Sequence, residues 1–393
     1  MAKDNNAVQD GSNANASPAP TNGIVAASLA GLMPKDYSIS IDRYNRGGTD
    51  RFLLNPPTER KQTMRGFEPE YMDIIDYIVR ITHRIWEEGA VGYIYDTYRH
   101  DARVYDDTGL KYGRDRVVAE TAISINGFPD NRAYADDVIW AGSDEVGFHT
   151  SHRAVNIGHN TGYTRFGPPT GKKVFYWVIA NCVSIENEIY EEWVLYNSGS
   201  ILKQLGHNLF DVARELAPQT DFSGLRDLRF GEPERLPGQG KPPVYPASTS
   251  GRFDVEDFIR RAYHEIWNWR LLNKLHDYYV PNVRVHSATD REMYGIGSYK
   301  SFILSMLAMF PDAALHIDFI YWMGNDAEGY RTSVRWSLVG THRGPGIYGK
   351  PTGKQIYMWG ITQHIIKDGK IKEAWMMFNE FAVIQQLVSY EAR

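Results

Sequence analysis

Six histidines on strand-like segments are the side chains in this chain best suited to moving protons. They are His149, His152, His159, His316, His342 and His364. A neutral imidazole in a pocket can act as a proton shuttle. Successive residues of a strand face opposite sides, so at most one of His149 and His152 enters a pocket. The alternatives are hydrogen-bonded structural histidines and a three-histidine metal site, although the spacing differs from that of compact metal motifs.

Much of the sequence occurs twice at a constant offset. Residues 128–205 match residues 310–387, and both copies contain Phe-Pro-Asp and Pro-Thr-Gly-Lys. Upstream, Trp86 matches Trp267 after a one-residue slip. A repeat of this length is a whole small domain rather than a solenoid unit. We therefore expect two copies of one domain, with function in either or both.

Two arginines and two tryptophans occupy equivalent positions in the copies. Arg153 and Arg335 fall on the same central strand-like segment, where a buried cation needs a partner. That partner is either an acidic residue across the sheet or a carboxylate or phenolate of a ligand. Trp177 and Trp359 are candidates for contacting the ligand or for packing in the core or between sheets.

Each copy is expected to open with an amphipathic helix, as the helical spacing of Ile74, Ile78, Ile81 and Ile85 indicates in the first. A strand, a second helix and a run of antiparallel strands follow. The expected strands are 102–106, 283–287, 314–323, 329–342, 354–366 and 371–379, and the second helices are 113–126 and 295–309. This order predicts an α+β fold. The expected architecture is two tandem cone-shaped domains, each a curved antiparallel sheet wrapped on N-terminal helices, packed through their sheets.

The composition excludes several classes of partner. A net charge of -5 gives no basic field for nucleic acid or an anionic membrane. The single cysteine, Cys182, excludes internal disulfides and cysteine-based zinc clusters. The 25 tyrosines and 10 tryptophans suit large cores, and some could line a pocket for a flat ligand. We expect a small-molecule substrate, no nucleic-acid or membrane partner, and a possible homo-oligomer built on the internal pseudo-dimer.

Composition also predicts the domain boundaries. Residues 1–66 are expected to be a disordered tail and an N-terminal arm, 67–216 the first domain, 217–251 a Pro/Gly-rich linker, and 252–393 the second domain. The apolar stretch 23–33 is too short to cross a membrane and lacks the basic region of a signal peptide. The predicted location is cytoplasmic.

The repeated motifs resemble the SnoaL-like branch of the nuclear transport factor 2 superfamily. The resemblance rests on Gly-Pro-Pro-Thr-Gly-Lys at 167–172, Gly-Lys-Pro-Thr-Gly-Lys at 349–354, Gly-Thr-His-Arg-Gly at 340–344, and Glu-x-Trp ending at Trp375. This superfamily includes isomerases, dehydratases, polyketide cyclases, epoxide hydrolases, lyases and non-catalytic binders, so it fixes no single activity. Its enzymes typically need no metal or cofactor. A phosphate loop is not expected, because a strand follows Pro-Thr-Gly-Lys where that motif needs a helix.

The resemblance implies a general base at Asp106, because residues 102–106 match the Ala-x-Val-x-Asp setting of the family's enolising isomerases. Desolvation at the rim of an apolar cone would raise the pKa of this carboxyl into a useful range. The alternative is that Asp106 belongs to an exposed Asp-Gly turn. In the second copy Ser287 stands at this position.

Further candidates follow from the same comparison. Tyr105 and His286 precede the position of the expected base in the two copies. The family's oxyanion-donating tyrosine falls on Thr82 in the first copy and on Tyr263 in the second. The candidate catalytic residues are Asp106, His149, His152, Tyr105, Tyr263, His286, His342 and His364; the candidate substrate-binding residues are Arg153, Arg335, Trp177, Trp359 and Thr82. No metal site and no cofactor are expected.

Three functions are compatible with these residues. The first is a cofactor-independent lyase that eliminates water or a carbon fragment from a small hydroxylated, lignin-type aromatic by general acid/base catalysis. The second is an isomerase or polyketide-type cyclase, which differs in where the proton returns. The third is a non-catalytic ligand-binding or assembly module, for which a filled cone in both copies would be evidence. The first copy is expected to hold the better-formed base.

Overall fold

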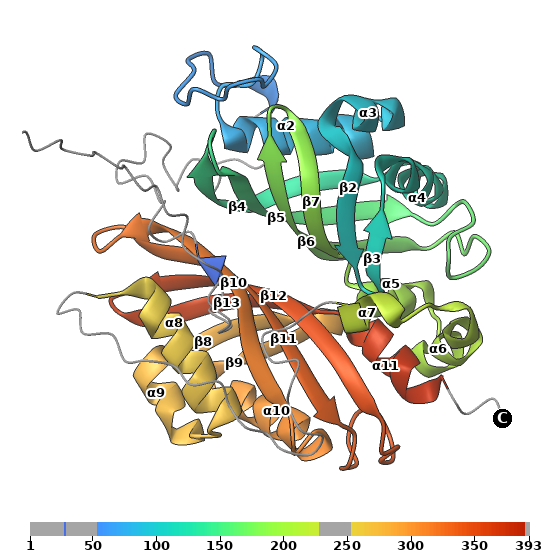
Figure 1. The fold of residues 1–393 in the computed structure, drawn as a ribbon. Coiled ribbons are helices and arrows are strands. Elements are labelled where there is room, and N and C mark those ends of the chain that lie inside the picture. Colours follow the sequence, from blue (N-terminus) through green and yellow to red (C-terminus); the bar gives the residue numbers. More distant parts are fainter. Residues whose placement is uncertain (1–26, 29–52, 228–252, 390–393) are drawn as a thin grey trace, which may run out of the picture.

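The computed structural model describes residues 27–28, 53–227 and 253–389, which form two domains of the same topology (Figure 1). The strands of the first sheet are β2 (Tyr98–Asp106), β3 (Gly109–Tyr112), β4 (Arg132–Ser143), β5 (Gly147–His159), β6 (Lys173–Ile185) and β7 (Glu188–Leu195). Their order in the sheet is β3-β2-β7-β6-β5-β4. Neighbouring strands are antiparallel except for the parallel pair of β2 and β7.

The second sheet repeats this arrangement. Its strands are β8 (Tyr279–Ser287), β9 (Arg291–Tyr294), β10 (Ala314–Asn325), β11 (Gly329–Thr341), β12 (Gln355–Lys367) and β13 (Lys370–Phe378). The short β1 (Ala27–Ser28) adds to β10 in parallel, and β13 pairs with β8 in parallel. The α+β prediction is confirmed, with the refinement that each sheet is mixed rather than wholly antiparallel.

Helices cover the outer face of each sheet. Those of the first domain are α2 (Ile74–Trp86), α3 (Ile94–Thr97) and α4 (Arg114–Gly127). Three further helices follow the first sheet in the chain and lie next to the second domain: α5 (Ser198–Leu205), α6 (Leu209–Leu216) and α7 (Ser223–Asp227) (Figure 1). Those of the second are α8 (Val255–Tyr263), α9 (Leu275–Tyr278), α10 (Gly295–Met309) and α11 (Glu380–Val388). None of the helices in the described residues is long and apolar enough to cross a membrane.

The first helix of each domain begins at an aspartate. The Asp73 carboxylate accepts a hydrogen bond from the Asp76 amide at 2.8 Å, and Asp254 does the same for Asp257 at 3.0 Å. These N-caps satisfy amides that the helix itself leaves unpaired. The buried face of α2 carries Ile74, Ile78, Ile81 and Ile85, at the spacing that the sequence predicts.

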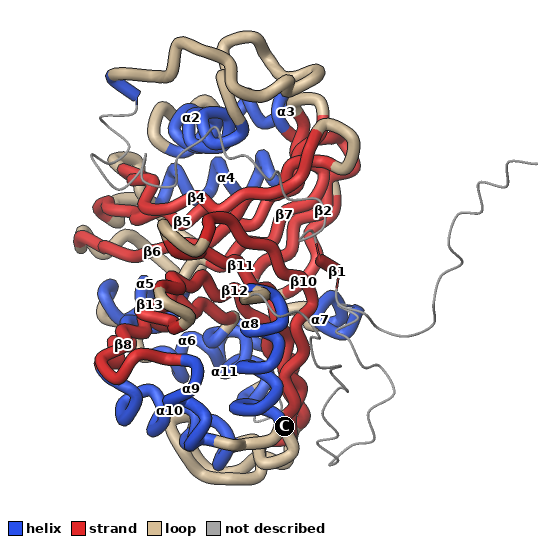
Figure 2. The backbone as a smooth tube through the Cα atoms, turned by 90° about the vertical axis from the view of Figure 1, so that its left-hand side faces the viewer, coloured by secondary structure: helices blue, strands red, loops and turns tan. Residues whose placement is uncertain are grey.

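The two sheets lie face to face, with the helices of each domain on the outer sides (Figure 2). This confirms the expected packing. Side chains from both sheets meet between them: Gln363 donates hydrogen bonds to the Ser151 carbonyl at 3.1 Å and hydroxyl at 2.9 Å, and Asn181 donates to the Ser333 hydroxyl at 3.2 Å. Ser151 and Ser333 are equivalent, and so are Asn181 and Gln363, so the interface has an internal pseudo-twofold symmetry.

The segments between and before the domains are partly described. The predicted tail at 1–26, residues 29–52 of the predicted arm and residues 228–252 of the predicted linker region lie outside the described residues. The described end of the arm packs on the first domain, where Met64 is fully buried. The described start of the linker, 217–227, is folded as a turn followed by α7, which contacts β3.

Candidate active site

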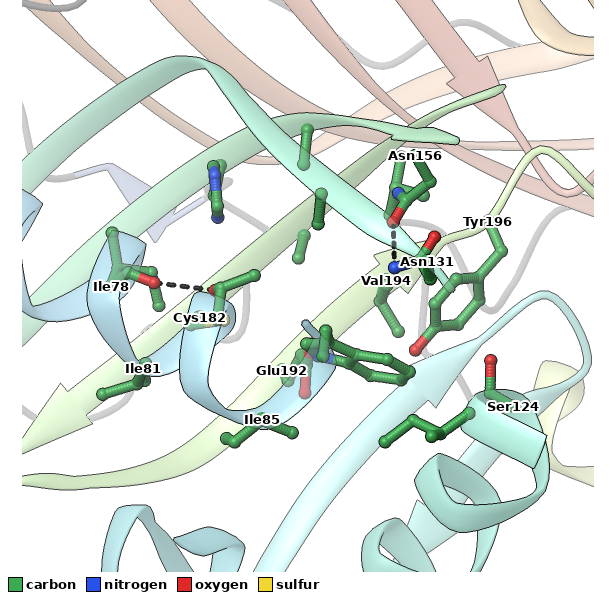
Figure 3. A pocket seen from close by; sticks show the side chains of 18 of the residues that line it. Ile78, Ile81, Ile85, Ser124, Asn131, Asn156, Cys182, Glu192, Val194 and Tyr196 are labelled. Carbon is green, nitrogen blue, oxygen red and sulfur yellow. Dashed lines mark hydrogen bonds between the residues drawn. The ribbon is translucent and has the colours of Figure 1, made fainter. Parts of the chain in front are cut away.

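The first cone contains a cavity between α2, α4 and the inner faces of β5, β6 and β7 (Figure 3). The volume that the centre of a water molecule could occupy in this cavity is about 80 Å³. One water needs about 10–15 Å³ by this measure, so a small substituted ring fits. The cavity exists because small side chains, such as Ala154, Ala180 and Val178, face the inside of the cone. Ile78, Ile81 and Ile85 of α2 supply an apolar wall opposite the sheet.

His152 projects from β5 into this cavity. Its side chain is buried, and within the described residues its Nε2 atom has no hydrogen-bond partner. Burial lowers the pKa of His152 to about 4, so the imidazole is neutral near pH 7. His149, on the opposite face of β5, stacks on Phe319 of the second domain at 5.1 Å between ring centroids. The prediction that at most one of these two histidines enters the cone is confirmed.

Glu192 of β7 is the acidic side chain in the cavity. Its Oε2 accepts a hydrogen bond from the Tyr98 hydroxyl at 2.8 Å. Burial raises the pKa of Glu192 to about 7, and the Tyr98 hydrogen bond opposes that rise. The sequence analysis did not select Glu192. Its signal was present, because adjacent Glu191 and Glu192 on one strand must face opposite sides and one of them therefore enters the cone.

The sheet register places these groups on either side of β6. His152 pairs with Ala180, and Cys182 pairs with Glu192. The Cα atoms of His152 and Glu192 are therefore on the order of 10 Å apart, with their side chains converging on the space in front of β6. A small ligand can contact both side chains at once.

Thr82 also lines the cavity, as predicted, but its hydroxyl donates to the Ile78 carbonyl at 2.7 Å within α2. A hydroxyl engaged in this way is a poorer oxyanion donor than the tyrosine that the enolising isomerases of the resembled superfamily have at this position.

Asp106 does not line the cavity, which contradicts the expected position of the base. Its Oδ1 accepts hydrogen bonds from the amide and the hydroxyl of Thr108, both at 2.8 Å. The carboxylate therefore stabilises the turn between β2 and β3, as in the alternative interpretation, although this turn is largely buried rather than exposed. Tyr105 faces away from the cavity and stacks on Trp193 at 3.9 Å, so it is an interface residue rather than a catalytic one.

Arg153 and Arg335 lie between the two sheets and not in the cone. The Arg153 guanidinium lies 3.5 Å from the ring centroid of Trp375, and the Arg335 guanidinium lies 3.7 Å from that of Trp193. Each arginine thus crosses to the tryptophan of the other domain, and the two tryptophans are equivalent. Arg153 also donates to Asp136 at 2.6 Å. The Asp136 contact is the acidic partner across the sheet that was one of the two alternatives for Arg153, and the cation–π contacts join the domains.

The two predicted ligand-binding tryptophans also belong to the region between the domains. Trp359 is fully buried and its indole nitrogen donates to the Asp106 carbonyl at 3.2 Å. Trp177 is half-buried and packs against a hydrophobic cluster to which both domains contribute. Neither lines the cavity of the first cone.

The interior of the second cone is filled where the first is hollow. Trp336 takes the position of Ala154 and is buried, and its indole nitrogen donates to the Thr362 hydroxyl at 2.9 Å. Gly360 makes room for it, since a Cβ atom there would lie 2.4 Å from the Trp336 ring. His364 and Tyr263 do meet inside this cone, with 3.4 Å between Nε2 and the hydroxyl. Burial lowers the pKa of His364 to about 3.

The other histidine candidates have structural partners. His286 lies between Glu373 at 3.0 Å and Glu292 at 2.6 Å, which raises the pKa of the imidazole although burial lowers it. His342 follows β11, where its Nδ1 atom lies 3.3 Å from the Thr352 hydroxyl. Neither faces the cavity of the first cone. His159 is at the protein surface, 2.6 Å from Asp130, and is likewise remote from the cavity.

Within the described part of the chain, no three His, Cys, Asp or Glu side chains come together as a metal ion would require. The absence of a metal and of a cofactor from the reaction stays a prediction.

Comparison with known protein families gives a match for the second domain. Residues 257–387, which make up most of the second domain, match the family model described as SnoaL-like polyketide cyclase. The first domain repeats the topology of the second strand for strand. The second domain is thus similar to the SnoaL-like polyketide cyclases, and the first domain shares its topology. No curated protein sequence matches it at a significant level.

Several solved structures are each similar to about a third of the chain, the length of one domain. A Jannaschia sp. CCS1 protein assigned to the SnoaL-like polyketide cyclases is 17% identical, with 35% of this chain and 97% of that chain covered and a TM-score of 0.32. TsrD from Streptomyces laurentii is 18% identical (35% and 98% covered, TM-score 0.30). A SnoaL-like polyketide cyclase from Agrobacterium tumefaciens strain C58 is 16% identical (35% and 99% covered, TM-score 0.28).

Proposed function

We propose that the first domain is a cofactor-independent lyase, with Glu192 as its general acid/base and His152 as a hydrogen-bonding partner of the substrate. The observation that carries this proposal is the buried Glu192 carboxyl, whose pKa of about 7 lets it both accept and donate a proton near neutral pH. The unpartnered Nε2 atom of His152 lies in the same cavity.

The proposed elimination of water uses one carboxyl group twice. The Glu192 carboxylate removes a proton from the carbon next to the carbinol carbon, and the electron pair of that C–H bond forms the new double bond. The C–O bond breaks, and the departing oxygen takes the proton from Glu192 and leaves as water. Neutral His152, in the tautomer protonated at Nε2, donates a hydrogen bond to this oxygen as negative charge develops on it.

Release of a carbon fragment follows the same logic. Glu192 removes the hydroxyl proton of a hydroxymethyl group. The carbon–carbon bond then breaks, its electron pair stays on the substrate as a carbanion, and formaldehyde leaves. Glu192 then returns the proton to the resulting carbanion. Both reactions leave the carboxyl as it began, so neither needs a co-reactant. The apolar wall formed by α2 and the aromatic side chains of the cavity suit a small hydroxylated aromatic, and a lignin-type alcohol is the narrower proposal.

A second candidate is an isomerase or polyketide-type cyclase, favoured by the family model that the second domain matches. The same carboxyl would then return the proton to another carbon of the substrate. The mass of the product separates the two functions, because an isomerase or a cyclase that forms only a carbon–carbon bond releases nothing. The third candidate, a non-catalytic module, suits the second domain, where Trp336 fills the cone.

The test is turnover of a panel of hydroxylated aromatic alcohols, with products identified by mass spectrometry. Glu192→Gln is expected to lower kcat by about 10²–10⁴-fold, the usual contribution of a positioned acid/base. Glu188→Gln, on the same strand but outside the cavity lining, is the control and is expected to retain activity. Full activity in Glu192→Gln, with the wild-type protein active, would exclude Glu192 as the acid/base.

A further inference from the structure

A second group of polar side chains lies at the opposite end of the same cavity. It comprises Ser124 of α4, Asn131 before β4, Asn156 of β5 and Tyr196 after β7. Figure 3 shows these four together, on the far side of the view from Ile78 and Cys182. We call them the outer cluster. The proposed chemistry at Glu192 and His152 does not use them.

The sheet spacing separates the outer cluster from the proposed chemistry by the length of a small molecule. Asn156 is four residues beyond His152 on β5, with Ala154 between them on the same face. Tyr196 is likewise four residues beyond Glu192. Four residues of strand span about 13 Å, so each of the two strands offers one polar group near either end of the cavity. Apolar side chains lie between the ends.

The outer cluster is not needed to build this fold. At the equivalent positions of the second domain stand Met306, Ala313, Leu338 and Phe378, all apolar and all in a well-packed cone. The first domain therefore has four polar side chains at positions where the second domain has only apolar ones. All four side chains are half-buried, so they can exchange hydrogen bonds to water for hydrogen bonds to a ligand that enters the cavity.

The outer cluster also has unused hydrogen-bonding capacity. Asn131 Nδ2 donates to Asn156 Oδ1 at 3.2 Å, which leaves the other half of each amide free to bond elsewhere. No lysine or arginine is among the described residues that line the cavity. A carboxylate or phosphate would thus find no counter-charge, whereas a neutral hydroxyl or carbonyl would find both donors and acceptors. Trp86 and Phe128, at this end of the cavity, offer flat surfaces for a ring.

We propose that the outer cluster is a second binding subsite, which recognises a neutral hydroxyl or carbonyl group at the far end of an aromatic substrate. This inference rests on the proposed function for the identity of the inner end. It narrows the substrate class to small aromatics that carry a reacting alcohol at one end and an uncharged hydrogen-bonding substituent at the other.

The test compares the binding of two probes that differ by one group. 4-Hydroxybenzyl alcohol has both polar ends, and benzyl alcohol lacks the ring hydroxyl. Their Kd values are measured by calorimetry on the wild-type chain and on Asn131→Ala/Asn156→Leu, which introduces the residues of the second domain. Ala154→Trp/Val178→Gly introduces the tryptophan and glycine that fill the second cone, so loss of binding in this variant shows that the probes occupy the first cavity.

The wild type is expected to bind 4-hydroxybenzyl alcohol about 2–10-fold more tightly than benzyl alcohol, the effect of one net hydrogen bond. The double variant is expected to lose this preference and to bind benzyl alcohol as the wild type does. A preference that persists in the asparagine double variant, or binding of both probes that survives Ala154→Trp/Val178→Gly, would overturn the subsite. His152→Val, which also introduces the second-domain residue, is the control variant and is expected to keep the preference.

Binding and turnover separate the two proposals. If the preference depends on the asparagines but Glu192→Gln keeps full turnover, the subsite stands and the proposed function fails. If Glu192→Gln abolishes turnover and the binding preference is unchanged in the asparagine double variant, the proposed function stands and the subsite fails.

Discussion

Replacing Glu192 by glutamine is expected to stabilise the protein at alkaline pH and to leave its stability unchanged at acidic pH. The carboxyl is buried, and its pKa is about 7 in the folded protein against an ordinary value of 4.5. Because the folded state holds this proton more tightly than the unfolded chain, stability falls as pH rises from 4.5 to beyond 7. At 1.36 kcal/mol for each pH unit between the two values, the ionised carboxyl costs about 3 kcal/mol.

Glutamine has the same shape, can accept the Tyr98 hydrogen bond, and carries no charge. The difference in the free energy of unfolding between Glu192→Gln and the wild type should therefore grow from near zero at about pH 4 to about 3 kcal/mol at about pH 8.5. Urea denaturation across this range measures it, and other titrating groups cancel because both proteins share them. Glu188→Gln is the matched control. A difference independent of pH would refute the reasoning that burial raises this pKa.

Three further outcomes follow from the rest of the molecule. Trp336→Ala should open a cavity in the second cone and destabilise the protein by about 3–5 kcal/mol. Indole should then raise the Tm of the variant more than that of the wild type, and equal shifts would mean that the second cone collapses. Arg335→Met removes the cation that contacts Trp193 and the positive charge near Asp318, and should lower the free energy of unfolding in urea by about 3–5 kcal/mol. Adding Asp318→Asn should restore part of this loss. Additive effects of the two substitutions would argue against coupling between Arg335 and Asp318. Turnover should survive dialysis against EDTA, since a carboxyl shuttle needs no metal, and restoration of lost turnover by one divalent metal would contradict the proposed mechanism.

The duplication made the fold predictable from sequence. A pattern that occurs twice gives each element two independent readings, and the strands predicted at 314–323 and 329–342 agree closely with β10 and β11. The short edge strands β3 and β9 were not predicted, because four residues are too few to show an alternating pattern.

The site was harder to predict, because alternation along a strand gives the parity of a side chain but not its partners. Asp106 is buried and lies at an alternating position of β2 that would face the cone. It is also the last residue of the strand, however, and its carboxylate accepts a hydrogen bond from the Thr108 amide. Arg153 and Arg335 were correctly expected to need partners, but besides an aspartate of its own domain each contacts a tryptophan of the other domain. Only tertiary packing could show that two buried arginines serve an interface rather than a ligand.

Fusion of the two copies has a consequence for how such a cavity can arise. In a dimer of identical chains, any substitution appears in both subunits, so a tryptophan that closes one cone closes the other. Here the buried Trp336 fills one cone, while Ala154 leaves the other open. The second domain thus has a packed interior, and the first has a cavity. The shared chain also makes their association independent of protein concentration. A single gene duplication thus releases each half from the constraint of resembling its partner.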